Sequence, residues 1–456
     1  MRKMFRAMLM LMVASMMLVA CGGDTTPTAQ PSPTTAAAVQ AAPTNTTAAA
    51  VMTSTVATAA PTATTAAAAA GPTPTKPKPV ASKEGTLTIW VDAGRVPAIT
   101  ELGKQFTAKY NVPVVVQELG FGDIRDDLKL SGPAGEGPDL IIGAHDWLGE
   151  LVSNGLLEPL DLGAKAASFN PVAVKAFTYN GKLYGMPYSV EAVALMYNKD
   201  LVPTPPKTWD ELKQIAKQLQ DAGKVEQGYV LQQGDPYHTE ALNTGFGGYI
   251  FGRNADGSYN PQDVGLDSPG AKAAAAELDS MVKQGLLRKD VTADLMNSMF
   301  QQGKSAMMIT GPWALGDVRK SGIHYGVAKI PTMKQTPRPF VGVQGFMVSA
   351  FAKNKLLAKT FLTEYVATDD AMMALYKAVP ASMAWLPIKD KINDPDLAVF
   401  AASASDGDPM PAIPQMSSVW DSWTKAIVLI FQQQQAPDKA MDDAAKAIRD
   451  KIASSK

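Results

Sequence analysis

Carboxylate and aromatic side chains follow three predicted strands of the chain. Asp146 and Glu191 each come after a strand, and Asp235 and Tyr237 follow another. Ionised carboxylates accept hydrogen bonds from hydroxyl groups, and aromatic rings cover the apolar C–H face of a pyranose. The mixture suits a sugar. Each residue alone has a structural alternative, because acids at strand ends often cap helices and aromatic residues often belong to a core.

Motifs for enzymatic chemistry are incomplete in this sequence. Gly303-Lys304-Ser305 resembles the end of a phosphate-binding loop, but Ser298 stands where the first glycine of that loop is required. The histidines His145, His238 and His324 are far apart in the sequence, and none belongs to a zinc-binding pair. We therefore expect no cofactor, no metal site and no catalytic residue.

Strands and helices alternate along the chain. Residues 86–91 form a predicted strand, the apolar positions from 99 to 110 lie on one helical face, and a β-branched run follows at 112–117. Thr208 and Glu211 form a predicted capping box at the start of a helix. This alternation favours open α/β sheets, in which ligands bind beyond the carboxyl ends of the strands.

Length and charge limit the possible partners. The 456-residue chain has a formal net charge of −1, so it lacks the electrostatic footprint of a nucleic-acid-binding protein. From Glu84 onward the composition is that of a globular protein, and this part is long enough for two domains.

The N-terminus resembles an exported, lipid-anchored protein. Basic residues precede an apolar run that ends at Leu18-Val19-Ala20-Cys21, and this run is too short to span a bilayer. The pattern is similar to the lipobox of bacterial lipoproteins, so we expect residues 1–21 to be a signal peptide and Cys21 to be lipidated. Residues 22–83 are rich in Thr, Ala and Pro and form a predicted disordered tether. The protein would lie on the extracytoplasmic face of the cell membrane, held there by the lipid.

From Glu84 to the C-terminus the chain resembles the maltose/maltodextrin-binding proteins, which are solute receptors of carbohydrate ABC importers. The resemblance rests on ordered blocks that include Leu87-Thr-Ile-Trp-Val, Gly137-Pro-Asp-Leu-Ile-Ile, Ala144-His-Asp, Tyr197-Asn-Lys-Asp-Leu-Val-Pro, Met308-Ile-Thr-Gly-Pro-Trp and Ile413-Pro-Gln-Met-Ser.

The resemblance implies an α/β, two-lobed periplasmic-binding-protein (type II) fold with a hinge and an interlobe ligand cleft. Residues 84–190 and 346–390 would form one lobe, and residues 195–340 and 396–456 the other. It also implies a monomer that is not an enzyme, captures maltose or malto-oligosaccharides and delivers them to importer permease subunits. Trehalose, sucrose or cyclodextrin as ligand, or a sugar sensor without transport, are the alternatives.

The family's sugar contacts carry over to specific positions. Asp146, Glu191 and Asp235 match carboxylates that accept sugar hydroxyls, with Tyr237 beside the last, and Trp313 and Trp420 match stacking aromatics. The resemblance also makes Asp92 and Arg95 predicted sugar contacts, with Arg95 as the basic one. The loop that holds them is one residue shorter than the family's pattern.

Two departures bear on specificity. Gly143 stands where a tryptophan is often found, and an aromatic follows four residues later as Trp147. Glu240 occupies another aromatic position of the family. The resemblance therefore implies a retained disaccharide subsite with altered outer contacts, and Trp147 is a predicted outer contact.

Overall fold

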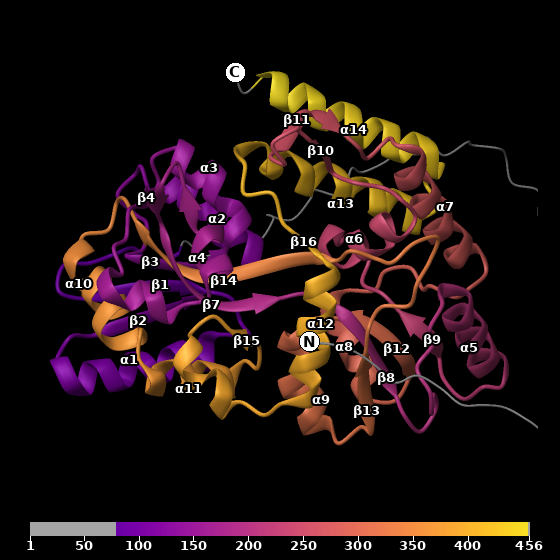
Figure 1. Cartoon of the computed structure of the whole chain (residues 1–456), viewed down its shortest axis with the longest axis horizontal. Helices are drawn as coiled ribbons and strands as arrows, with labels where there is room; N and C mark the ends of the chain where they lie inside the picture. The colour runs from indigo at the N-terminus through magenta and orange to yellow at the C-terminus, as the bar shows by residue number, and fades with distance from the viewer. Residues whose placement is uncertain (1–78, 455–456) are drawn as a thin grey trace, which may run out of the picture. The chain divides into compact units, whose positions relative to one another are not determined.

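The computed structural model describes residues 79–454. The chain divides into two units, residues 1–74 and 75–456, and the described residues belong to the second. Cys21, the predicted signal peptide and the predicted tether as far as residue 78 lie outside the described residues. The second unit contains two separate main sheets, each with its own helices (Figure 1).

The larger sheet has eight strands, and we call it, with its helices, lobe 1. Its order is β15-β7-β14-β3-β1-β2, with β4 and β16 paired to β14. The strands are β1 Leu87–Val91, β2 Val114–Glu118, β3 Leu140–Ala144, β4 Leu157–Glu158, β7 Gly185–Glu191, β14 Phe340–Ser349, β15 Ser382–Met383 and β16 Asp408–Pro409. The helices of this lobe are α1 Val96–Tyr110, α2 Phe121–Ser131, α3 Leu148–Ser153, α4 Pro171–Ala176, α10 Lys355–Thr360 and α11 Asp369–Ala378.

The start of lobe 1 follows from local patterns. Every residue of β1 is buried, and β1 pairs in parallel with both β2 and β3. On α1 the side chains of Ile99, Leu102 and Phe106 are buried, as their helical spacing predicts. The fold begins before Glu84, because Ser82 is buried and its hydroxyl donates a 2.6 Å hydrogen bond to Asp139.

The smaller sheet has four strands in the order β13-β8-β12-β9, and we call it, with its helices, lobe 2. Its strands are β8 Ala194–Asn198, β9 Gln227–Val230, β12 Ser305–Thr310 and β13 Tyr325–Ala328. Helices α5 Trp209–Asp221, α8 Ala293–Gln301, α9 Leu315–Ser321 and α12 Pro395–Asp406 surround it. The predicted capping box is confirmed, since the Thr208 hydroxyl and the Glu211 carboxylate each accept a backbone N–H at the start of α5.

A helical layer completes lobe 2. Helices α13 Ser417–Phe431 and α14 Pro437–Ser454 pack on each other and on α7 Pro269–Lys283, and α6 Pro236–Gly245 contacts α7 and α13. The hairpin formed by β10 Phe251–Arg253 and β11 Tyr259–Val264 contacts α14 through β11.

Lobe 1 also contains a small hairpin, formed by β5 Thr178–Tyr179 and β6 Lys182–Leu183.

The chain passes between the two sheets at the ends of long strands. Ala192 and Val193 alone separate β7 from β8, and residues 329–339 lead from β13 into β14. Within lobe 1, Glu191 at the end of β7 pairs with Gly342 near the start of β14. Side chains at these strand ends therefore lie where the two lobes adjoin.

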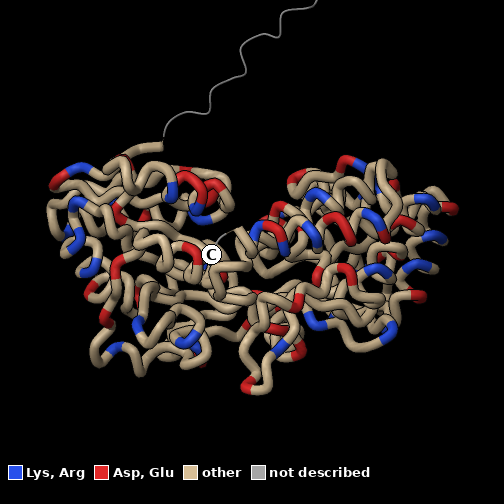
Figure 2. Tube along the Cα trace, turned by 90° about the horizontal axis from the view of Figure 1, so that it is seen from above, with Lys and Arg blue, Asp and Glu red and all other residues tan. Residues whose placement is uncertain are grey.

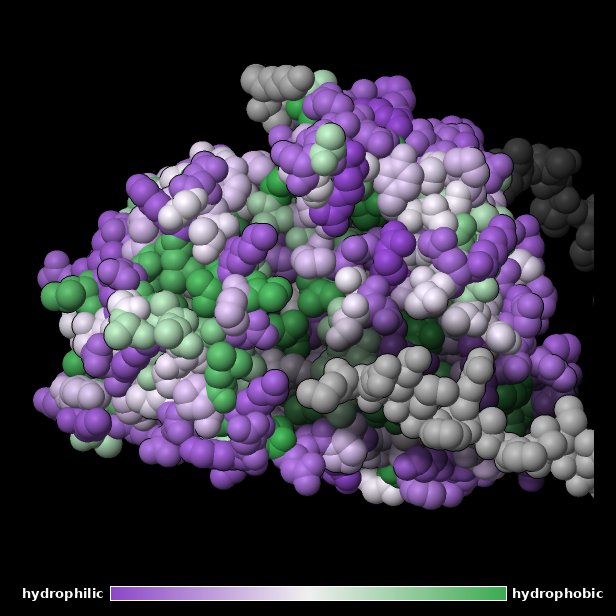
Figure 3. Space-filling model, viewed as in Figure 1, coloured by the Kyte–Doolittle hydropathy of each residue, from purple (hydrophilic) through white to green (hydrophobic). Residues whose placement is uncertain are grey.

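The described surface carries charges of both signs, and few large hydrophobic residues are highly exposed on it. Lysine and arginine alternate with aspartate and glutamate over both lobes (Figure 2). On the face drawn in Figure 3, hydrophobic residues gather mainly over lobe 1. None of the helices within residues 79–454 combines the length and the apolar character needed to cross a membrane.

Candidate functional site

Arg95 lies at the centre of a buried polar cluster in lobe 1. Asp92 and Arg95 belong to the loop between β1 and α1, and Arg95 is only 8% exposed. Its Nη1 donates to Asp92 Oδ2 at 2.6 Å, its Nη2 lies 3.5 Å from Glu191 Oε1, and its Nε donates to the Tyr188 hydroxyl. The Ser189 hydroxyl donates to the same Glu191 oxygen at 2.8 Å. Two carboxylates are thus held around one guanidinium.

Burial and charge compete in this cluster. Burial lowers the pKa of Arg95, whereas Tyr188, Asp92 and Glu191 raise it. The raising effects together are larger, so the pKa of Arg95 is above its usual value. Burial raises the pKa of Glu191, and the nearby Arg95 and the Ser189 hydrogen bond oppose this rise. Arg95 and Ser189 thus hold the Glu191 carboxylate in place at the end of β7, where it can accept charge-assisted hydrogen bonds.

Tyr237 connects lobe 2 to this cluster. It lies in the first turn of α6, and its hydroxyl donates to the Glu191 backbone carbonyl at 3.1 Å. Its ring contacts the rings of Trp313 and Phe340, with centroid distances of 5.9 Å and 6.1 Å. A Cβ atom on Gly342 would stand 3.2 Å from the Tyr237 hydroxyl, so a glycine at this position permits the close approach.

Asp146 and Trp420 form a second connection between the lobes. Asp146 belongs to the short helix η1 His145–Trp147 after β3, whereas Trp420 lies on α13 of lobe 2. The Trp420 Nε1–H donates to Asp146 Oδ2 at 3.0 Å, and the Trp420 ring lies 5.9 Å from the Phe340 ring. Burial raises the pKa of Asp146 to about 6, against the opposing effects of Arg125 and of the Trp420 hydrogen bond.

His145 fixes the helix that carries Asp146. Its Nδ1 accepts the backbone N–H of Val343 at 3.1 Å, so Nε2 carries the proton and donates to the Met410 carbonyl at 3.1 Å. Burial lowers the pKa of His145 to about 4, and the hydrogen bond that Nε2 donates to the Met410 carbonyl opposes this. A neutral histidine therefore joins η1 to β14 and to the segment that leads toward Trp420.

Trp147 and Phe121 close the arrangement. Trp147 is only 4% exposed, and its ring fills the space over Gly143, where an added Cβ would lie 1.9 Å from it. The ring of Phe121 contacts that of Trp147 at 4.8 Å, and the Arg95 guanidinium lies 6.0 Å from the Phe121 centroid. Because Asp146 and Trp147 are neighbours in the chain, these contacts close a circuit through both lobes: Arg95, Glu191, Tyr237, Phe340, Trp420, Asp146, Trp147 and Phe121.

Asp235 and Trp313 stand at the edge of this circuit. Asp235 is the N-cap of α6, where Oδ1 accepts the backbone N–H groups of Tyr237 and His238. Its Oδ2 accepts from Gln232 and lies 2.9 Å from His238 Nδ1. Trp313 contacts Tyr237 and His238, and its ring folds over Gly311. In this structure Asp235 performs the capping role that its position also allows.

Sequence reasoning missed three residues of the site: Tyr188, Phe340 and Phe121. Tyr188 and Phe340 lie in apolar segments whose sequence predicts buried strands, and the residues that contact them come from distant parts of the chain. Phe121 opens α2 after Gly120, a position whose only sequence signal is an apolar residue at a helix start. Among residues 79–454 no group of three histidine, cysteine, aspartate or glutamate side chains could hold a metal ion.

Comparison with known proteins agrees with this architecture. The family model of the bacterial extracellular solute-binding proteins matches residues 101–403. The chain is 32% identical over 400 residues to the galactooligosaccharide-binding protein of Bacillus subtilis strain 168, which covers 84% of this chain and 93% of that protein. It is 30% identical to the maltodextrin-binding protein of the same organism, over 82% of this chain and 92% of the relative. The maltotriose-binding protein of Pyrococcus abyssi is 29% identical to the chain, and the match covers 78% of this chain and 79% of the relative. The chain therefore belongs to the bacterial extracellular solute-binding proteins.

Proposed function

We propose that this protein captures maltose or malto-oligosaccharides and delivers them to the permease subunits of an ABC importer. The observation that carries the proposal is the circuit of carboxylates and aromatic rings contributed by both lobes. Carboxylates suit the many hydroxyl groups of a sugar, and aromatic rings suit its C–H faces. Relatives named for maltodextrin, maltotriose and maltooligosaccharide support this class of ligand.

A galacto-oligosaccharide is the second candidate ligand. It is favoured by the 32% identity to the galactooligosaccharide-binding protein, over nearly the full length of that relative. Gluco- and galacto-oligosaccharides present the same kinds of hydroxyl and C–H surface, so the circuit supports both. Trehalose, sucrose and cyclodextrin remain alternatives, as does a sugar sensor without transport.

The two lobes would close on the ligand about a hinge. Support comes from the short crossover between β7 and β8 and from the longer one before β14. Tyr237 and Trp420 of lobe 2 meet Glu191 and Asp146 of lobe 1, so a sugar held by all four would favour the closed state.

We expect binding without chemical conversion of the sugar. The named relatives are binding proteins, and the family model describes solute binding. A glycoside hydrolase needs one carboxyl that protonates the leaving oxygen and a second that attacks or activates water. Here Arg95 and Ser189 hold the Glu191 carboxylate, and Trp420 holds that of Asp146, which suits fixed acceptors of hydroxyl hydrogen bonds.

The receptor would be a monomer held on the extracytoplasmic face of the cell membrane by lipidated Cys21. The basic residues, the apolar run and Ala20-Cys21 support this anchor, and two relatives are named as lipoproteins. The Thr-, Ala- and Pro-rich segment after Cys21 would separate the lobes from the membrane.

A screen of sugars by thermal unfolding tests the proposed function. Maltose and maltotriose should raise the melting temperature, because a ligand at 100 times its Kd adds about 2.7 kcal/mol to the folded state. Galactobiose, galactotriose, trehalose, sucrose and a cyclodextrin complete the screen, with mannitol as the control. If none of these sugars stabilises the protein, the function proposed here is wrong.

The Asp146→Asn variant separates a sugar contact from a structural acid. Loss of the charged acceptor should weaken binding by about 5- to 150-fold, equivalent to about 1–3 kcal/mol, measured by calorimetry at pH 7.5. Without ligand the variant should melt no lower than the wild type, because the buried charge of Asp146 is itself unfavourable.

Titration of Asp146 should change stability and sugar affinity in opposite directions. The folded pKa of Asp146 is raised from 3.8 to about 6, so its contribution to stability is present at low pH and is lost as the pH rises through about 6. Sugar affinity should follow the opposite course and fall below pH 6. Asp450→Asn, at an exposed carboxylate on α14, is the control. A lower melting temperature with unchanged affinity would assign Asp146 to the fold.

Replacement of Cys21 tests the anchor. In cells the wild-type protein should partition with the membrane fraction and into detergent, and Cys21→Ser should abolish both by removing the acylated thiol. Fractionation with immunodetection provides the measurement. A Cys21→Ser protein that is processed and still retained in the membrane would contradict lipidation at this residue.

A further inference from the structure

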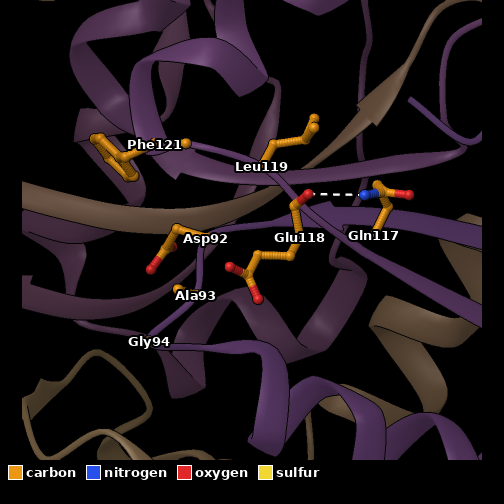
Figure 4. Close-up of a pocket in the computed structure, with 8 residues that line it drawn as sticks. Asp92, Ala93, Gly94, Gln117, Glu118, Leu119 and Phe121 are labelled. Carbon is orange, nitrogen blue, oxygen red and sulfur yellow. Dashed lines mark hydrogen bonds between the residues drawn. The ribbon is translucent and has the colours of Figure 1, made fainter. Parts of the chain in front are cut away.

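A cavity lies beside the circuit, at the carboxyl ends of β1 and β2. Its volume is about 420 Å³, within the range typical of small-molecule sites. Its lining consists of two short segments: Asp92, Ala93 and Gly94 after β1, and Gln117, Glu118, Leu119, Gly120 and Phe121 at the end of β2 and the start of α2 (Figure 4). Of these residues, only Asp92 was among the predicted sugar contacts.

Phe121 gives this cavity an aromatic wall. Phe121 is 37% exposed and is the one residue of the circuit among the exposed large hydrophobic residues. The ring of Trp147 and the guanidinium of Arg95 lie against it. Trp147 contacts it at 4.8 Å with an interplanar angle of 50°, and the Arg95 guanidinium lies 6.0 Å from its centroid. The supported ring offers an accessible apolar surface, while Trp147 is itself buried behind it.

The remaining lining suits hydroxyl groups. The exposed Glu118 contributes a carboxylate, and Asp92 contributes a second one that also pairs with Arg95. The Gln117 amide donates to the Glu118 carbonyl at 2.8 Å and lies at the same edge (Figure 4). Ala93, Gly94 and Gly120 have little or no side chain, so a ligand can approach the backbone closely.

We propose that this cavity is a further sugar-ring subsite and that Phe121 is the residue that stacks on the added ring. The inference rests on the proposed function and extends it to oligosaccharides of at least three rings. Asp92 makes the subsite continuous with the circuit, because it lines the cavity and also pairs with Arg95. Trp147 then supports the platform from behind instead of contacting the sugar.

Chain-length dependence tests the subsite. Affinities of the wild type, Phe121→Ala and Phe121→Leu are measured by calorimetry for the two-ring and three-ring members of the malto and galacto series. In the series that binds, both variants should lose roughly 5- to 10-fold in affinity for three rings and less than about twofold for two rings. Leu130→Ala, at an exposed position of the same helix that does not line the cavity, should change neither affinity.

The outcomes separate this inference from the function on which it rests. Phe121→Leu still covers Trp147, so a loss confined to Phe121→Ala, or an equal loss for two and three rings, would overturn the stacking role. Unchanged affinities would also overturn it, even though sugar binding by the wild type would still support the proposed function. If the wild type binds no member of either series, both the function and the subsite are wrong.

Discussion

The buried guanidinium of Arg95 is the constraint around which the candidate site is arranged. A charge removed from water costs several kcal/mol unless partners compensate it, and here Asp92, Glu191 and Tyr188 do so. These partners come from the loop after β1 and from β7, so pairing with Arg95 fixes those two segments against each other. The Glu191 carbonyl can then accept the Tyr237 hydroxyl from lobe 2. The cluster around Arg95 thus lies directly beside one of the hydrogen bonds that join the two lobes.

The positions of the aromatic rings of the site depend on glycines in neighbouring segments. Trp147 occupies the volume that a side chain at Gly143 would need, and Trp313 does the same over Gly311. A larger residue at either glycine would displace the ring that covers it. Tyr237 similarly depends on Gly342 for its approach to β14. Aromatic and glycine positions therefore have to change together, which gives a physical route to altered sugar specificity within one fold.

Much of the fold could be predicted because its signals are local. The run at residues 86–91 predicted β1, helical spacing predicted α1, and the capping box at Thr208 predicted the start of α5. Membership of the solute-binding family was also predicted from ordered sequence blocks and is confirmed. Such patterns depend only on neighbouring residues, so no knowledge of long-range contacts is needed.

The details of the site were less predictable because they depend on distant partners. Trp420 and Asp146 are 274 positions apart, and nothing local indicates their hydrogen bond. Asp235 fits a sugar contact and a helix cap equally well in sequence, and only the structure shows its capping bonds. The partial exposure of Phe121 depends on the packing of Trp147 beneath it. The roles of these residues in sugar binding stay predictions.

A double-mutant cycle on Arg95 and Glu191 tests most directly whether the buried cluster serves ligand binding. Unfolding free energy and affinity for the stabilising oligosaccharide would be measured for Arg95→Met, Glu191→Gln and the double variant. Arg95→Met should lose about 3–5 kcal/mol of stability, because it leaves buried carboxylates unpaired. The double variant should regain much of that stability but still bind the sugar at least about tenfold more weakly than the wild type. A double variant that is stable and binds with wild-type affinity would contradict this account.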